Sequence, residues 1–395
     1  MSLINDYITK IRNGWGPLQL EDELQKLISV YNKHRNTYLI IYSAAMQKNI
    51  PEISLNQDDF YTIVDLLSEK KGSNSIDFYV ETPGGSGVAA EEIARFLHNN
   101  FNVVTFIIAG EAKSAGTILA LSGHEIFMSE TGSLGPIDAQ VKIGRSVISA
   151  SDYCEWINEK RKEADKNKRL NPFDATMVAQ ISPGELESVR HALQFAIDRV
   201  AEWIKNYKFK DWSITETRKI EVTDKMKADR AREIAENLAK HSNWQSHGRS
   251  IKIEDLSNWL KINKVEDDHV ISDTISRIKI VSTLLFQTTS TFKMFVTENY
   301  KIFRQATPRP QPLTLPQKNQ QISSFEAIQK CPNCGHEHKL YGKFIHDPII
   351  DKEEKGKGFM PIPKSFKLNC DCGQEIDLTG IKNDIEMKTG RQIIN

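Results

Sequence analysis

Residues 76–87 read Ile-Asp-Phe-Tyr-Val-Glu-Thr-Pro-Gly-Gly-Ser-Gly, an apolar run that passes directly into a glycine-rich turn. The run is typical of a buried strand, and the turn opens a helix that we expect at Val88–His98. Two adjacent glycines, Gly84 and Gly85, let the backbone turn sharply with no side chain in the way. Their amide hydrogens are free to face a cleft, so the turn is a candidate oxyanion hole, a phosphate cradle or a plain tight turn.

The alternation of strands and helices continues on both sides of this turn. Apolar runs of strand type occur at Tyr38–Tyr42, Ser75–Val80, Val103–Ile108 and Glu125–Met128, and helical spacing occurs at Asp58–Leu67, Val88–His98 and Ser114–Leu121. Such alternation predicts an α/β fold of repeated βαβ units with right-handed crossovers. From about residue 150 to 300 the helical spacing dominates, so we expect a helical second half that packs on the sheet.

Ser114 stands in the segment Lys113-Ser-Ala-Gly116, between a predicted strand and a predicted helix. The start of a helix favours negative charge, which lowers the cost of forming an alkoxide or a tetrahedral anion. The small residues Ala115 and Gly116 leave room for a substrate. Ser114 is therefore the candidate nucleophile, although a serine at a helix start is more commonly an N-cap.

A third turn, Gly132-Ser-Leu-Gly-Pro-Ile-Asp138, follows the strand Glu125–Met128 and is expected beside the same cleft. Together, in this order, the three segments resemble the ClpP/crotonase superfamily, and most closely the serine dehydrogenase proteinase family, which is similar to signal peptide peptidase A. The resemblance covers roughly residues 36–270. It implies a ClpP/crotonase-like core, with Ser114 as nucleophile and Gly84 and Gly85 as the oxyanion turn.

The general base is not set by these motifs. In ClpP-like enzymes a histidine follows the nucleophile by about two dozen residues, but here that interval ends near Asp138, and no histidine lies between His124 and His191. The resemblance to signal peptide peptidase A implies a lysine instead, with Lys166 and Lys162 as candidates. Such a lysine acts as a base only when burial or nearby positive charge lowers its pKa.

His247 is the alternative base. It lies in Asn243–Ile251, which resembles a later His-Gly-containing segment of the family; a histidine in a surface loop is the plainer interpretation.

Four cysteines form two close pairs near the C-terminus. Cys331-Pro-Asn-Cys334 is a C-x₂-C knuckle, and Cys370-Asp-Cys372 is a shorter C-x-C pair. Four thiolates suit a tetrahedral structural zinc ion, so we predict Zn²⁺ held by Cys331, Cys334, Cys370 and Cys372 in a small zinc ribbon. Because the second pair is one residue short, His336 and His338 are alternative ligands. A closed site leaves no position for water, so we assign no metal catalysis.

Composition bounds the remaining interpretation. The chain has 395 residues with 52 basic and 52 acidic side chains, so net charge indicates no nucleic-acid partner, although basic and aromatic residues of the ribbon permit contact with protein or nucleic acid. No window of 18 apolar residues predicts a membrane span, and the N-terminus lacks the blocks of a secretory signal, so we expect a cytoplasmic protein. We predict four parts: a helical segment at 1–35, a ClpP/crotonase-like serine protease domain at 36–300, a Pro/Gln-rich linker at 301–327, and a zinc-ribbon-like module with its tail at 328–395.

Three functions fit these features. The first is a serine peptidase acting on a polypeptide, and the resemblance implies that it assembles as a homo-oligomer. The second is a catalytically inactive ClpP-like scaffold that binds polypeptide or nucleic acid through its cleft and zinc ribbon. The third is acyl-CoA chemistry of the crotonase kind, which would use the same oxyanion turn but leaves the Lys113–Gly116 segment unexplained.

Overall fold

The computed structural model describes residues 2–68, 72–143, 146–215, 217–306 and 323–394, which form two compact units, Met1–Thr307 and Pro308–Asn395. Residues 307–322, the greater part of the linker predicted at 301–327, lie outside the described residues. The described ends of that stretch are strands, β11 (Lys301–Gln305) and β12 (Ser324–Lys330).

A seven-stranded sheet forms the centre of the first unit, in the order β11-β10-β1-β2-β3-β5-β9. The five strands from β1 to β9 run parallel, and β10 and β11 continue the sheet in antiparallel pairing. The bounds are β1 (Tyr38–Ala44), β2 (Ser75–Glu81), β3 (Val103–Ile108), β5 (Glu125–Met128), β9 (Asn263–Lys264) and β10 (Thr291–Val296). The parallel strands follow in chain order, as the predicted βαβ alternation requires, and this confirms the α/β class.

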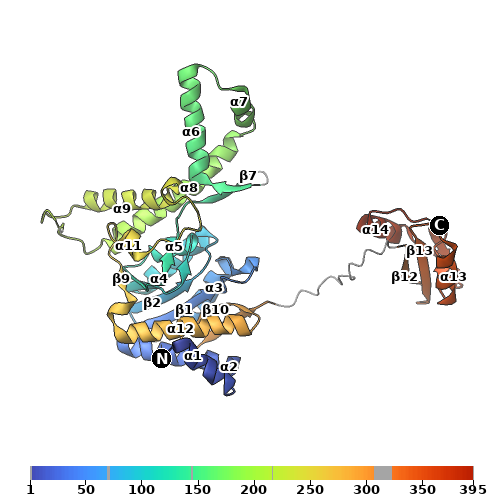
Figure 1. The fold of residues 1–395 in the computed structure, drawn as a ribbon, viewed down its shortest axis with the longest axis horizontal. Helices are drawn as coiled ribbons and strands as arrows, with labels where there is room; N and C mark the ends of the chain where they lie inside the picture. The colour runs from blue at the N-terminus through green and yellow to red at the C-terminus, as the bar shows by residue number, and fades with distance from the viewer. Residues whose placement is uncertain (1, 69–71, 144–145, 216, 307–322, 395) are drawn as a thin grey trace. The chain divides into compact units, whose positions relative to one another are not determined.

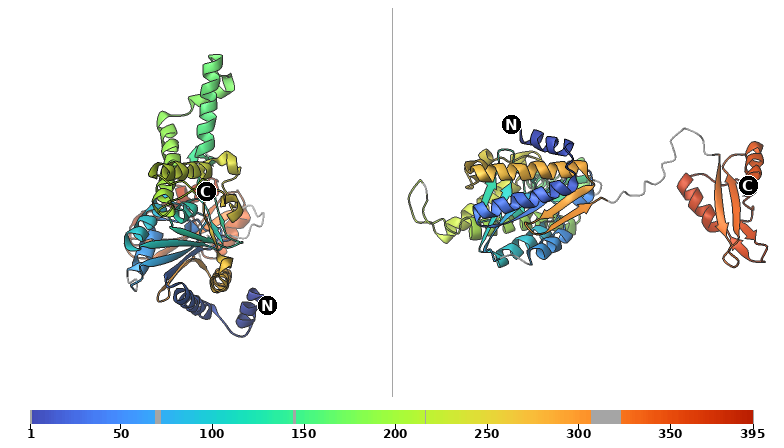
Figure 2. Two further views of the ribbon diagram at one scale, coloured as in Figure 1. Left: turned by 90° about the vertical axis from the view of Figure 1, so that its left-hand side faces the viewer. Right: turned by 90° about the horizontal axis from the view of Figure 1, so that it is seen from below.

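Helices cover both faces of the sheet (Figures 1 and 2). One core lies under α3 (Gln57–Leu67), α4 (Gly87–Asn100), α5 (Ala115–Ala120), α8 (Pro183–Trp203) and α9 (Asp224–Ala239). The other lies under α1 (Leu3–Arg12), α2 (Pro17–Arg35) and α12 (His269–Thr288). Successive residues of β2 alternate between them, with Phe78 and Val80 in the first core and Tyr79 in the second.

Strand β10 was not anticipated, because the sequence predicts helices up to residue 300. A strand that is buried on both faces is typically a continuous apolar run. Here Lys293 interrupts the run formed by Phe292, Met294 and Val296. In the structure Lys293 is fully buried within the sheet. The sequence pattern therefore failed to predict this core strand, because the charged side chain is paired inside the protein.

A hairpin and a pair of helices extend from the sheet between β5 and α8. They are β7 (Gln140–Ile143), β8 (Ser146–Ser149), α6 (Ala150–Asn167) and α7 (Pro172–Ala179), and Figure 1 shows α6 and α7 projecting from the sheet. Short elements complete the unit near the ends of the parallel strands: β4 (Glu111–Ala112), β6 (Ser133–Leu134), α10 (His241–Trp244) and α11 (Ile253–Leu256). Within the described part of the chain, no helix combines the length and apolar character needed to cross a membrane.

The second unit consists of two small sheets and two helices. β12 pairs with β13 (Glu337–Lys343), and β13 pairs with β14 (Met360–Pro361); β15 (Lys367–Asn369) pairs with β16 (Glu375–Asp377). The helices are α13 (Pro348–Gly356) and α14 (Thr379–Thr389). Each cysteine pair lies in the turn of a hairpin, one between β12 and β13 and the other between β15 and β16, an arrangement compatible with a small zinc ribbon.

Candidate active site

Ser114 occupies a strained backbone position between β4 and α5. Its φ is 48° and its ψ is −116°, values that a side-chain-bearing residue rarely adopts. The residues on either side are fixed, since Lys113 N–H donates to Thr82 O at 3.0 Å and Gly116 N–H donates to Lys113 O at 2.8 Å. The half-buried Ser114 side chain makes no capping hydrogen bond, so its hydroxyl is not spent on the helix start.

The glycine pair lies directly against this serine. Gly84 has φ +97°, and a Cβ added to it would meet both Lys113 O and Ser114 Cβ at 2.7 Å. Gly85 has φ +144°, and its added Cβ would lie 2.3 Å from Leu55 O. Both positions therefore require glycine for conformation and for space. The structure brings Ser114 and the turn into contact, as the two motifs predict.

The two amides of the turn differ in their hydrogen bonding. Gly84 N–H donates to Thr82 Oγ1 at 3.2 Å. Among the hydrogen bonds of the described residues, none uses the N–H of Gly85 or that of Ala115, which follows the serine. Gly85 and Ala115, rather than Gly84, therefore have amide hydrogens available for a ligand oxygen.

Asp138 forms the centre of a second polar group. It is fully buried, and its Oδ1 lies 2.7 Å from His247 Nδ1. Its Oδ2 lies 2.9 Å from His241 Nδ1 and accepts from Gln140 Nε2, also at 2.9 Å. His241 Nε2 in turn lies 3.6 Å from Asp152 in the first turn of α6. Sequence reasoning named Asp138 and His247 separately but missed both their pairing and His241.

The charge on Asp138 determines which ring nitrogen of His247 carries a proton. Burial raises its pKa, but the hydrogen bonds and charge of His247 and His241 outweigh burial and hold the pKa below its ordinary value. An ionised carboxylate only accepts hydrogen bonds, so Nδ1 of His247 carries a proton. In the neutral imidazole the lone pair is then on Nε2, and the His247 side chain is about one third exposed.

Lys113 ties the loops of this region together. Its buried ammonium lies within hydrogen-bonding distance of four oxygens: Ser133 Oγ at 3.2 Å, Leu134 O at 3.2 Å, Arg249 O at 3.3 Å and Ser250 Oγ at 2.9 Å. Burial lowers the pKa of Lys113. The residue before Ser114 is thus bonded both to the segment that leads to Asp138 and to the segment that follows His247.

The candidate lysines occupy a different place. Lys162 and Lys166 are exposed on α6, and none of the contacts among the described residues joins either of them to Ser114. A lysine base therefore stays a prediction. A cavity of about 410 Å³ lies between α6, α7 and α8, and its lining includes none of Ser114, the glycine turn or Asp138.

The four C-terminal cysteines converge on one point in the second unit. Their sulfur atoms all lie within 4.8 Å of one another, with 3.7 Å between Cys331 and Cys372 and 3.6 Å between Cys334 and Cys370. Four sulfurs about 2.3 Å from a tetrahedral ion are separated by about 3.8 Å, so the cluster fits a single metal ion. His336 and His338 are not part of the group.

The two cysteine turns are built alike, which explains why the shorter pair still fits. Gly335 N–H donates to Cys331 O in the first turn, and Gly373 N–H donates to Cys370 O in the second. Both glycines have positive φ, 74° and 85°. The second turn closes one residue earlier, and this absorbs the missing residue of the C-x-C pair.

A positive-φ serine held against Gly84, at the carboxyl ends of a parallel sheet, agrees with the ClpP-like α/β fold expected from the three motifs. The profile of the ClpP-like SDH-type serine proteinases matches residues 49–193. The match over these residues confirms the resemblance drawn from the three motifs.

Curated relatives match shorter stretches. The chain is 39% identical over 66 residues to the uncharacterized protein MJ1495 of Methanocaldococcus jannaschii, which covers 17% of this chain and 23% of that protein. It is 31% identical over 124 residues to the uncharacterized protein MJ0137 of the same organism, covering 30% and 43%. The chain thus spans less than half the length of the curated relatives it matches.

Two solved structures of the 1510-N membrane-bound stomatin-specific protease show a distant likeness. A serine-to-alanine mutant is 15% identical, covering 57% of this chain and 79% of that chain, with a TM-score of 0.32. A lysine-to-alanine mutant in complex with a substrate peptide is 16% identical, covering 53% and 70%, with a TM-score of 0.30. Both likenesses are too distant to bear on the roles of residues.

Gly84→Ala is expected to lower the rate at which a fluorophosphonate probe labels Ser114 by about 100-fold, the scale of losing an oxyanion donor. The added methyl group would lie 2.7 Å from Ser114 Cβ and force the turn away from the serine. The labelling rate measured by gel fluorescence tests this. Gly184→Ala, at a glycine with no atom within 4 Å of the added methyl, is the control. Labelling of Gly84→Ala at the native rate would contradict the contact.

Proposed function

We propose that the chain is a serine peptidase in which Ser114 attacks the carbonyl carbon of a peptide bond. The observation that carries the proposal is the uncommitted Ser114 hydroxyl, on a strained turn in contact with Gly84. Strain at a nucleophile is typical of hydrolases in which a serine lies between a strand and a helix. The family match of residues 49–193 agrees with this chemistry.

The oxyanion of the tetrahedral intermediate is assigned to the Gly84–Gly85 turn, with Gly85 N–H and Ala115 N–H as the two donors. Support comes from the hydrogen bonds of the described residues, in which Gly84 N–H already has an acceptor and the other two do not. Two fixed amides stabilise charge that develops only in the transition state, so they accelerate the reaction rather than merely tighten binding. In this assignment Gly84 permits the close approach of the turn to Ser114 but donates no hydrogen bond to the oxyanion.

His247 is the general base of this proposal, with Asp138 as the residue that orients it. The 2.7 Å contact between Asp138 and His247 Nδ1 leaves Nε2 as the basic nitrogen. The His247 segment also reaches the residue beside Ser114, through the bonds of Lys113 to Arg249 and Ser250. His241 and Gln140 hold the other oxygen of Asp138, so the carboxylate cannot turn away.

The steps follow from these roles. His247 Nε2 takes the proton of the Ser114 hydroxyl as the oxygen bonds to the carbonyl carbon, and the imidazolium gives that proton to the leaving amine as the peptide C–N bond breaks. Water then repeats the sequence at the acyl-serine ester, with His247 again accepting and returning the proton. Each half-reaction leaves the histidine neutral and the site unchanged.

A base from α6 is harder to reconcile with the geometry. Asp152 in the first turn of α6 already lies beside His241. At 1.5 Å per residue, Lys162 is about 15 Å and Lys166 about 21 Å further along the helix. A Ser-Lys pair with either of these residues would therefore need a large rearrangement of α6.

Zinc binding in the second unit and self-association complete the proposed function. Zn²⁺ bound by Cys331, Cys334, Cys370 and Cys372 would hold the two hairpins together as a structural ion. Self-association, implied by the family, is supported by the exposed Phe173 and Met177 of α7 beside the cavity between α6, α7 and α8. Protein or nucleic acid as partner of the cysteine module stays a prediction.

Fluorophosphonate labelling tests the nucleophile. The native chain is expected to form one covalent adduct, and Ser114→Ala is expected to form none, because no other activated serine is proposed. Intact-mass spectrometry detects the added mass, and digestion locates it. Ser133→Ala, which alters a hydroxyl bonded to Lys113, serves as the control and should keep the adduct. A native chain that forms no adduct would favour the inactive scaffold over the peptidase.

The pH dependence of labelling tests the base. The labelling rate is expected to fall in acid, because a general base must be unprotonated to accept the proton of Ser114. The two histidine partners of Asp138 hold its pKa below the ordinary value, so the carboxylate is ionised at neutral pH and the stability it contributes is lost only as the pH falls through that lowered pKa.

His247→Gln should lower the maximal labelling rate, reached at high pH, by roughly 10²- to 10⁴-fold, the usual contribution of a general base. Lys162→Met and Lys166→Met should each change that rate by less than about twofold. A collapse of the rate in either lysine variant, with His247→Gln unaffected, would transfer the role to α6.

Zinc content tests the cysteine cluster. The purified chain is expected to release about one Zn²⁺ when its thiols are blocked with a mercurial reagent in the presence of a chromogenic chelator, because four thiolates close one tetrahedral site. Cys334→Ser and Cys372→Ser should each lose most of that zinc. Cys154→Ser, outside the cluster, should retain it. Equal zinc content in all three variants would rule the cluster out as the site.

A further inference from the structure

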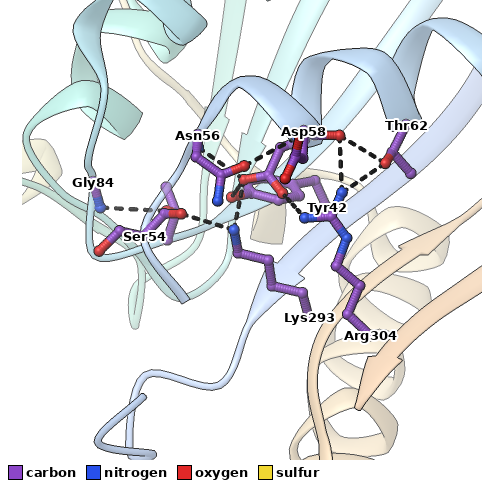
Figure 3. Close-up of polar contacts among 10 residues, drawn as sticks. Tyr42, Ser54, Asn56, Asp58, Thr62, Gly84, Lys293 and Arg304 are labelled. Carbon is purple, nitrogen blue, oxygen red and sulfur yellow. Dashed lines mark hydrogen bonds and ion pairs between the residues drawn. The ribbon is translucent and has the colours of Figure 1, made fainter. Parts of the chain in front are cut away.

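A buried ion cluster lies beside the Ser54–Leu55 segment, which is hydrogen-bonded to the glycine turn (Figure 3). Asp59 is fully buried and accepts four hydrogen bonds: from Lys293 Nζ at 2.6 Å, Arg304 Nη1 at 2.8 Å, Tyr42 Oη at 3.0 Å and Asn56 N–H at 3.0 Å. Lys293 is itself fully buried. Both carboxylate oxygens of Asp59 are therefore engaged, which fixes the geometry of the cluster.

The same lysine reaches the segment that supports the turn. Lys293 Nζ donates to Ser54 O at 2.7 Å. The next residue, Leu55, donates its N–H to Gly84 O at 2.7 Å, and Ser86 N–H donates to Leu55 O at 2.8 Å. Leu55 is thus bonded to both sides of Gly85 and limits how far the turn can move from Ser114.

Stability alone is a weak explanation for such a cluster. Taking two charges out of water costs several kcal/mol for each ion, and apolar residues of similar volume are often as stable as the buried pair they replace. The charged partners instead fix the relative positions of the groups, because each donor is bonded to a particular oxygen of one carboxylate. The cluster joins β10 and β11 to the start of α3, and that start is continuous with Ser54 and Leu55.

We propose that Lys293 and Arg304, acting through Asp59, are positioning residues that hold the Gly84–Gly85 turn against Ser114. This rests on the proposed role of the turn as an oxyanion hole. Lys293 acts directly on Ser54 and through Asp59, and Arg304 fixes the second oxygen of Asp59 while also bonding Asp58 O at 2.8 Å.

Both residues lie about one hundred positions beyond the matched family segment, residues 49–193. The oxyanion turn of that segment is therefore completed by the last two strands of the first unit.

The test compares Lys293→Met and Arg304→Met with Arg35→Met. Arg35 is a matched control, because its side chain is similarly exposed and pairs with another buried carboxylate, Asp77, at 3.3 Å. Asp77 lies near the start of β2, whereas the glycine turn follows the end of that strand. Two quantities are measured: the maximal inactivation rate and apparent affinity for a fluorophosphonate, and the hydrogen-exchange rate of a peptide covering residues 83–88. Thermal unfolding reports the general damage.

Lys293→Met and Arg304→Met are expected to lower the maximal inactivation rate by about tenfold, one order less than loss of an oxyanion donor, with probe affinity changed less than about twofold. Hydrogen exchange in 83–88 should rise by a similar factor. Arg35→Met should lose comparable thermal stability but keep the native rate and exchange. Native exchange in both cluster variants, or equal changes in Arg35→Met, would overturn the proposal. If the native chain fails to label, the peptidase proposal fails, and exchange in 83–88 still decides whether the cluster positions the turn.

Discussion

The close approach of Gly84 to Ser114 is the constraint on which the site depends. A Cβ at Gly84 would lie 2.7 Å from the serine Cβ and from Lys113 O, so the two backbones meet with no side chain between them. In the proposed mechanism, this contact places the glycine turn where a tetrahedral anion on Ser114 would develop. It also explains why Ser114 accepts a positive φ: a relaxed helix start would carry the hydroxyl into capping and away from the turn.

The groups around this contact come from distant parts of the chain. The turn follows β2, Ser114 follows β4, Asp138 follows β6, and His247 follows α10. Lys113 bonds three of these connections together, and Lys293 is bonded to Ser54, which precedes the residue that contacts the turn. Both ammonium groups are buried. That of Lys113 contacts carbonyl and hydroxyl oxygens, and that of Lys293 contacts Ser54 O and the Asp59 carboxylate. The hydrogen bonds of these buried lysines thus connect loops that have little regular secondary structure of their own.

Much of the fold was predictable because its signals are local. Apolar runs predicted β1, β2, β3 and β5 within one or two residues, and Glu125–Met128 has the predicted bounds. The two-residue strand β9 was not predicted. The serine and glycine motifs were predictable for the same reason, since a turn needs particular residues at particular positions. The cysteine pairs converged as predicted because each lies in its own tight hairpin turn.

What sequence reasoning missed depends on partners far apart in the chain. Strand β10 was hidden by Lys293, whose partner Asp59 lies more than two hundred residues earlier. The pairing of Asp138 with His247 and His241 spans more than one hundred residues, so counting residues from Ser114 arrived at the carboxylate but found no histidine. Lys162 and Lys166 have the separation from Ser114 in sequence that a lysine base requires. Both, however, lie several turns further along α6 than Asp152, the residue of that helix that contacts His241.

The most direct measurement of the central claim is a crystal structure of the chain phosphonylated on Ser114. The account predicts that the phosphonyl oxygen lies about 2.7–3.1 Å from both Gly85 N and Ala115 N, the distance expected of oxyanion donors. An adduct whose oxygen points away from the Gly84–Gly85 turn, with neither amide within hydrogen-bonding distance, would contradict it.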